Sequence, residues 1–199
     1  MYTREKVEGV MRQKGYVYFT SDTNYDLNII GIRNSVPGTE VTNLFDDLMT
    51  VSYKLNDSWV YREWPITTDP GKRAVTNYQN RQGVARLLPG QYRSSYAIGL
   101  HKGEYQALRQ IKEVKVYRDA NRDMVFNENK VQEGLFGINI HKAGTDTKFV
   151  ENWSEGCQVF KRLQDFNEFM RICKEASKIH GNGFTYTLLE SKDFDKPII

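Results

Sequence analysis

A histidine and a cysteine that could work together lie in the stretch 140–160. His141 precedes Cys157 by sixteen positions, and Cys157 closes a Ser-x-Gly-Cys turn that begins at Ser154. A thiol becomes a strong nucleophile when its pKa of about 8.5 is lowered by a nearby histidine, by backbone N–H groups or by a helix N-terminus. We therefore expect Cys157 to act as a nucleophile and His141 as the base that takes its proton.

The turn before the cysteine suits main-chain stabilisation of a developing negative charge. Gly156 allows the backbone to turn tightly, so the N–H groups near Cys157 can face an incoming carbonyl as an oxyanion hole. A helix is expected shortly after the turn, which would place Cys157 near a helix N-terminus. Trp153 lies beside the turn and is expected to wall a substrate cleft, although packing alone also explains an aromatic residue there.

Two metal-binding alternatives fit these residues less well. A zinc site needs three or four ligands, and His101 and His180 have no neighbouring Cys or His pair. The run Asp119-Ala-Asn-Arg-Asp123 begins like a calcium loop, but its sixth and twelfth positions hold Met124 and Lys130 instead of Gly and Glu. A hairpin turn explains that run by turn propensity, so we expect neither a metal nor a cofactor.

The pattern of apolar residues predicts a mainly β protein with helices, of the α+β class. Helical spacing predicts one helix over 4–14 and a long one from 163 to a stop at Gly181, with Cys173 on its buried side. Asn56-Asp57 is a hairpin signal between two strand-like runs. The expected strands cover residues 51–55, 59–64, 92–100, 114–118, 134–141 and 184–189.

Three segments give weaker signals. We expect a short helix over 44–50, an exposed loop over 71–83, and a helical or irregular excursion over 102–110. The length favours one domain over 1–199, with residues 1–49 as an N-terminal extension packed on it.

Composition excludes several classes of protein. Twenty-eight basic and 25 acidic residues give a net charge of +3, and the bases are scattered, so we do not expect a nucleic-acid partner. No apolar run reaches the roughly 20 residues of a membrane span. The first residues mix acids and bases, unlike a secretory signal. We therefore expect no membrane insertion and no classical export.

The spacing of these residues resembles the L,D-transpeptidase (YkuD-like) catalytic domain. Its signature is a strand ending in His-x-x-Gly or His-Gly, then a loop, then Ser/Thr-x-Gly-Cys, and this chain has His141-Lys-Ala-Gly144 and Ser154-Glu-Gly-Cys157. A weaker resemblance is Leu88-Pro-Gly-Gln-Tyr92, similar to the family's Thr-Pro-x-Gly-x-Tyr/Phe segment. The similar parts cover roughly residues 50–175, and they imply a β-sandwich or barrel with a long helix after the catalytic cysteine.

The resemblance also implies roles for individual residues. Cys157 would be the nucleophile and His141 the base, with the carbonyl of Lys142 or its neighbour orienting the imidazole. The N–H groups of Gly156 and Cys157 would hold the oxyanion, and Ser154 would brace the turn. The substrate would contact residues near the cleft, for which the resemblance and position indicate Trp153, Tyr92 and Gly144. The family usually reads Ser-His-Gly-Cys-x-Arg, whereas this chain has Glu155 and Val159 in place of the histidine and the arginine.

The activity implied is attack on a peptidoglycan stem peptide at the bond after its third, diamino-acid residue, through an acyl-thioester on Cys157. We expect hydrolysis, as in a phage-type lysin or a muropeptide L,D-carboxypeptidase, in the cytoplasm or released to the wall. The alternative is a non-catalytic cell-wall-binding or phage structural domain that retains the fold.

Overall fold

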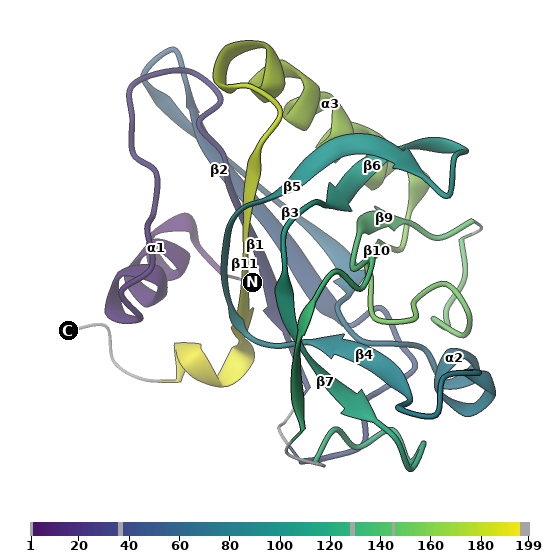
Figure 1. The fold of residues 1–199 in the computed structure, drawn as a ribbon. Helices are drawn as coiled ribbons and strands as arrows, with labels where there is room; N and C mark the ends of the chain where they lie inside the picture. Colours follow the sequence, from purple (N-terminus) through teal and green to yellow (C-terminus); the bar gives the residue numbers. More distant parts are fainter. Residues whose placement is uncertain (1, 36–37, 128–129, 145, 196–199) are drawn as a thin grey trace.

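The computed structural model describes residues 2–35, 38–127, 130–144 and 146–195. Eight strands close into a barrel and three more form a small sheet beside it (Figure 1). In barrel order the strands are β1 (Asn28–Arg33), β11 (Phe184–Glu190), β5 (Gly90–His101), β6 (Tyr105–Gln110), β9 (Ile140–Lys142), β10 (Gln158–Phe160), β3 (Ser58–Thr67) and β2 (Asp47–Leu55). The small sheet has the order β4 (Val84–Leu87), β7 (Val114–Asp119) and β8 (Val131–Gly134). The α+β class with mostly strands is therefore confirmed.

The hairpin predicted at Asn56-Asp57 joins β2 to β3. Both turn residues have positive φ, 49° and 63°, as a two-residue type I′ turn requires. The two strands pair from Leu55↔Ser58 to Asp47↔Ile66, so this hairpin forms a long, continuous part of the barrel wall.

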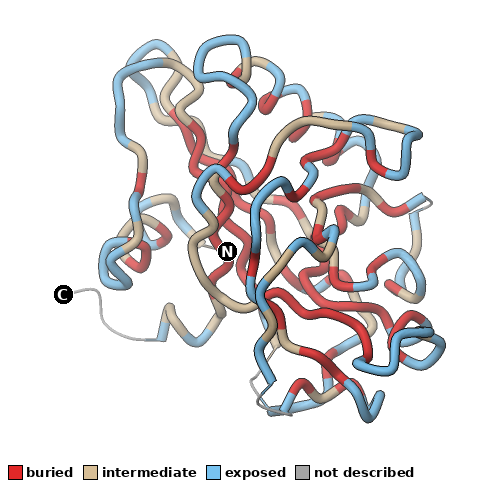
Figure 2. Tube along the Cα trace, viewed as in Figure 1, coloured by how far each residue is buried: buried red, intermediate tan, exposed pale blue. Residues whose placement is uncertain are grey.

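The long helix α3 (Leu163–His180) covers the barrel core. Its buried side chains belong to the same cluster as inward-facing barrel residues such as Trp64 and Phe160. Figure 2 shows burial along the strands and on one side of α3. Cys173 is fully buried in this cluster, and Gly181 ends the helix with φ 82°, both as expected.

Residues 1–49, expected as an extension packed on the domain, also contribute to the barrel itself. Helix α1 (Arg4–Gln13) is capped by the Thr3 side chain, and its Val7, Val10 and Met11 pack in a cluster with Ile30 and other residues on the outside of the barrel. Strand β1, however, lies within the barrel between β11 and β2. Residues 1–49 thus include β1 and the start of β2. The segments before and between these strands pack on the barrel, as Phe45 does in a cluster with Val159.

Four local expectations were wrong. Residues 47–50 are strand instead of helix, because β2 pairs with β1 on one side and with β3 on the other. The excursion expected over 102–110 is mostly strand β6, which pairs with β5. In both places ladder pairing outweighs local propensity.

The other two concern 71–83 and 134–141. The expected loop contains the short helix α2 (Lys72–Asn77), whose Ala74 and Val75 are buried. The single strand expected over 134–141 is divided into the end of β8 and the start of β9, because Phe136 and Ile138 donate their N–H groups to the Gln110 side chain. No helix in the described ranges is long and apolar enough to cross a bilayer.

Candidate active site

Two short parallel strands bring the histidine and the cysteine together. β9 and β10 pair with Gln158 opposite Ile140 and Val159 opposite His141, so Cys157, which precedes β10, lies beside the start of β9. Cys157 and His141 line one cavity of about 200 Å³. Its other walls include His101, Lys102, Arg118, Asn152, Trp153 and Glu155.

The His141 ring is held in one orientation. Its Nδ1 lies 2.9 Å from the Lys142 carbonyl oxygen and 3.4 Å from the Tyr105 hydroxyl. Because a carbonyl only accepts, Nδ1 carries the proton of the neutral ring, which leaves the Nε2 lone pair as the base. The Lys142 carbonyl therefore occupies the position that the resemblance implied for it.

Both groups are neutral at rest. Burial lowers the pKa of His141 to about 3, and a proton on the neighbouring His101 would act in the same direction. Burial also raises the pKa of Cys157 to about 11, with the Asn139 N–H bond acting against it and the Glu155 charge adding to it. The sulfur's hydrogen bonds are to the Asn139 N–H and the Gly137 carbonyl, both at 3.4 Å. Among the described residues, none joins the sulfur to the His141 ring.

The turn at Gly156 is fixed from several sides. Ser154 Oγ accepts the Gly156 N–H at 3.1 Å and donates to the Cys157 carbonyl at 2.8 Å. Gly156 has φ 117°, and a Cβ at this position would overlap the Ala85 carbonyl oxygen, so only glycine fits here. Gln158 donates to the Gly156 carbonyl at 3.2 Å.

These hydrogen bonds leave fewer main-chain donors for the oxyanion hole than expected. The Gly156 N–H already donates to Ser154 and is not available, whereas the Cys157 N–H has no hydrogen-bond partner among the described residues. The expected pair of main-chain donors is therefore reduced to one.

The helix N-terminus is also not at the cysteine. Strand β10 follows Cys157, and α3 begins only at Leu163 after Arg162. The helix dipole acts within about one turn of its end, so α3 does not lower the thiol pKa.

The three expected substrate contacts differ in position. Trp153 lines the cavity. Gly144 lies against the edge of the Trp153 ring, where any side chain would overlap it, so Gly144 sets the position of the indole. Tyr92 lies elsewhere, in a different surface depression, with its hydroxyl donating to the Leu88 carbonyl at 2.7 Å. The substrate contact expected for Tyr92 was wrong, because its hydroxyl binds the Leu88 carbonyl and so stabilises the 88–92 turn.

Sequence reasoning missed the positive charge in the cavity. Arg118, only 7% exposed, donates to the Gln132 side chain and the Gly83 carbonyl, and its guanidinium lies 5.1 Å from the Phe136 ring centre. Among the described residues no ion pair includes Arg118, and the partners that the structure describes for this buried cation are neutral. Nothing in the sequence marked it, since only the register of β7 brings it to the cavity.

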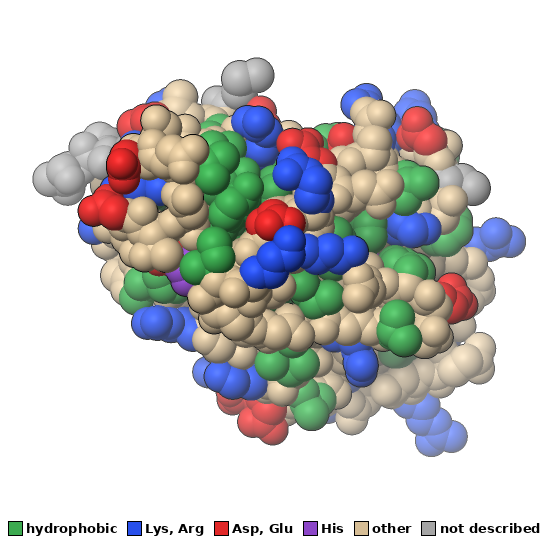
Figure 3. Space-filling model, turned by 90° about the horizontal axis from the view of Figure 1, so that it is seen from above, with side chains coloured by type: hydrophobic (Ala, Val, Ile, Leu, Met, Phe, Trp, Pro, Cys, Tyr) green, Lys and Arg blue, Asp and Glu red, His purple; other side chains and the backbone are tan. Residues whose placement is uncertain are grey.

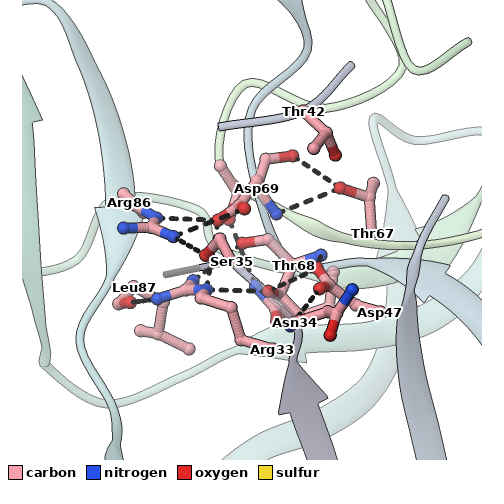
Figure 4. Close-up of polar contacts among 12 residues, drawn as sticks. Arg33, Asn34, Ser35, Thr42, Asp47, Thr67, Thr68, Asp69, Arg86 and Leu87 are labelled. Atoms are coloured by element: carbon pink, nitrogen blue, oxygen red, sulfur yellow. Dashed lines mark hydrogen bonds and ion pairs between the residues drawn. The ribbon is translucent and has the colours of Figure 1, made fainter. Parts of the chain in front are cut away.

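A buried ion network lies near the ends of β1, β3 and β4 (Figure 4). Arg33 and Arg86 both pair with Asp69, at 3.1 and 2.7 Å. Two residues beyond Asp69, the Gly71 N–H donates to the Ser154 carbonyl at 2.9 Å. The network thereby connects the ends of β1, β3 and β4 to the turn that carries Cys157.

The described residues contain no group of three or more His, Cys, Asp or Glu side chains placed to hold a metal ion. In the run first compared with a calcium loop, the Asp119 carboxylate accepts the N–H groups of Arg122 and Met124 at 2.7 and 2.9 Å. That is the arrangement of a turn stabilised by an aspartate side chain.

Comparison with protein-family models, with curated proteins and with solved structures finds no match to this chain.

Proposed function

We propose that this protein is a cysteine-dependent acyl-transfer enzyme of the L,D-transpeptidase type, acting on peptidoglycan stem peptides with water as the acyl acceptor. The observation that carries the proposal is the joint cavity of Cys157 and His141, with His141 Nδ1 fixed by the Lys142 carbonyl. The barrel with a long helix after the cysteine is in keeping with the fold that the resemblance implies.

The neutral pair sets the order of the chemical steps. As the Cys157 sulfur attacks the scissile carbonyl carbon, its proton passes to His141 Nε2, and the Cys157 N–H stabilises the oxyanion. The C–N bond then breaks, and the amine leaves with the proton from His141. Water next attacks the thioester and gives up a proton to His141. The C–S bond then breaks, His141 returns that proton to the sulfur, and the carboxylic acid product leaves the regenerated thiol.

Arg118 and Lys102 support a substrate that carries a carboxylate near the bond that is cut. A buried arginine bound only to neutral groups gains most from a charge-assisted pair with an anion. Stem peptides carry carboxylates next to their L,D bonds. Arg118 would thus supply from β7 the cation that the family usually has two positions after the cysteine, where this chain has Val159.

The setting follows from the same proposal. A lysin or a muropeptide L,D-carboxypeptidase would act in the cytoplasm or be released to the wall.

On the face drawn in Figure 3, basic side chains lie scattered among acidic ones, so that face offers no continuous basic surface of the kind nucleic acids bind.

The test is incubation of the full chain with purified muropeptides, followed by mass spectrometry of the products. We expect loss of a D-amino acid or cleavage of a cross-link, abolished in Cys157→Ala. Cys173→Ala is the matched control, because Cys173 is the other cysteine and lies in the core. Turnover that persists in Cys157→Ala would contradict the proposal.

A non-catalytic wall-binding domain is the second candidate. The observation that favours it is the neutral thiol and imidazole, which share no hydrogen bond in the described structure. For this candidate, sedimentation with purified peptidoglycan would show binding equal in wild type and Cys157→Ala, with no product released by either.

A further inference from the structure

A second histidine lies directly against the base. His101, the last residue of β5, stacks on His141 with ring centres 4.2 Å apart and ring planes inclined by 24°. Both side chains are buried, with 6% and 5% exposed. Forty positions separate the two histidines, and their spacing does not predict this contact. The ladder from β5 through β6 to β9 brings them together.

Asn139 contacts both the second histidine and the thiol. Its side-chain Oδ1 accepts the Gln110 N–H at 2.9 Å, which fixes the amide so that Nδ2 faces His101 Nδ1 at 3.1 Å. An amide NH₂ only donates, so His101 Nδ1 is an acceptor and the ring proton is on Nε2. The Asn139 backbone N–H lies 3.4 Å from Cys157 Sγ.

This arrangement disfavours a charge on His101. Protonation at Nδ1 would set two donors against each other, and it would place a cation against His141. Burial, followed by the charge of Lys102, lowers the pKa of His101, and Arg109 acts in the same direction while Glu104 opposes it. The charged groups that act on the pKa values of the two rings are Lys102, Glu104, Arg109 and Lys142. The Tyr105 hydroxyl lies beside His141, and Arg118, Glu155 and Cys157 line the same cavity as both rings.

We propose that His101, kept neutral by Asn139, is a positioning residue that fixes the ring plane of His141, and that Asn139 aligns this histidine pair with the Cys157 sulfur. One face of the His141 ring is occupied by His101, and its Nδ1 edge by the Lys142 carbonyl and the Tyr105 hydroxyl. The ring then cannot rotate or flip without losing contacts on two sides, and Nε2 stays directed to one place. This inference rests on the proposed function for its catalytic meaning, and on these contacts alone for its geometry.

The test compares His101→Ala, which removes the stacking ring, with His101→Phe, which keeps a ring but no nitrogen. The first measurement is the ¹H NMR titration of the His141 ring in the full chain. We expect the His141 midpoint to rise by about one pH unit or more in His101→Ala, because water and freedom of rotation return, and to rise less in His101→Phe. An unchanged His141 midpoint in a folded His101→Ala protein would overturn the proposal.

The second measurement is the turnover of muropeptides. Loss of alignment in His101→Ala should lower kcat by about tenfold or more with little change in KM, and His101→Phe should restore much of it. A fall in thermal stability without a change in kcat or in the titration would show a merely structural residue and refute positioning. If wild type shows no turnover, the proposed function fails, and the titration alone decides the inference.

Asn139→Asp tests the polarity of the link. A carboxylate would accept a proton on His101 Nδ1, so the His101 midpoint should move above its ordinary value of about 6.5. A His101 midpoint that stays low in Asn139→Asp would contradict the donor role given to Asn139.

Discussion

The charge states of Cys157 and His141 determine how the site can react. A thiolate–imidazolium pair needs a thiol pKa below that of the imidazole, and here burial moves the two pKa values apart, to about 11 and about 3. Proton transfer is then coupled to attack on the carbonyl and does not precede it. A resting thiol of this kind is protected from adventitious oxidation and alkylation, because the thiolate is the reactive form.

Two exposed neighbours of opposite charge allow a matched test of this electrostatic picture. The Glu155 charge raises the pKa of Cys157, and the Lys102 charge lowers it. Glu155→Gln should therefore speed alkylation of Cys157 by iodoacetamide at about pH 9, and Lys102→Gln should slow it, each by about two- to fivefold at low salt. Mass spectrometry of the alkylated peptides would follow the rates, with buried Cys173 as the internal reference. Shifts in the same direction in both variants would refute the assignment.

At the scale of elements, the ends of β1, β2, β3 and β4 are tied by buried polar contacts. The Asp47 carboxylate accepts the Asn34 N–H, the Thr68 N–H and the Thr68 hydroxyl, each at 2.7 Å. Arg33, 1% exposed, donates to the Thr68 carbonyl. The segment Thr68–Gly71 follows these contacts, and its Gly71 N–H donates to the Ser154 carbonyl. Contacts that fix the strand ends therefore also restrict the turn that carries Cys157.

The two carboxylates of this network titrate in opposite senses. Burial works against ionisation of Asp69, but the charges of Arg33 and Arg86 outweigh it and lower its pKa. Burial, with the charge of Asp69 as the second cause, raises the pKa of Asp47 to about 7. Between the unfolded value of about 3.9 and about 7, the folded state holds the Asp47 proton more tightly than the unfolded state does, so this group's contribution to stability falls as pH rises through that window.

Asp47→Asn isolates that contribution. The amide cannot ionise, so the destabilisation caused by the substitution should be larger at about pH 5 than at about pH 8, where wild type must bear the buried charge. Urea unfolding of both proteins at the two pH values measures the difference. Asp22→Asn is the control, because its carboxylate is largely exposed and pairs with Lys54 at the surface. A penalty that is the same at pH 5 and pH 8, or larger at pH 8, would show that the pKa of Asp47 is not raised.

At the scale of the whole molecule, periodicity and turn chemistry were sufficient where contacts are local. The 56–57 hairpin, α1, α3 and the last strand all follow from short-range patterns. The segments predicted wrongly, 44–50 and 102–110, form strands only because distant strands pair with them. Nothing in the sequence of either segment indicates which strand it will pair with. The site divides in the same way: the spacing of His141 and Cys157 was informative, whereas His101, Asn139 and Arg118 reach the cavity through barrel closure and register.

Barrel closure also predicts how the N-terminal segment can be shortened. Removing residues 1–15 deletes α1 and uncovers Ile30, Ile32 and Leu189 on the outside of the barrel, but it leaves every strand paired. We expect a folded protein with its free energy of unfolding lowered by about 3–6 kcal/mol, increased binding of an apolar dye, and an unchanged ratio of Cys157 to Cys173 alkylation.

Removing residues 1–33 also deletes β1, which pairs with both β11 and β2, and it leaves two open edges. That protein should show no cooperative unfolding by circular dichroism, and a cooperative transition in it would mean that the barrel does not depend on β1.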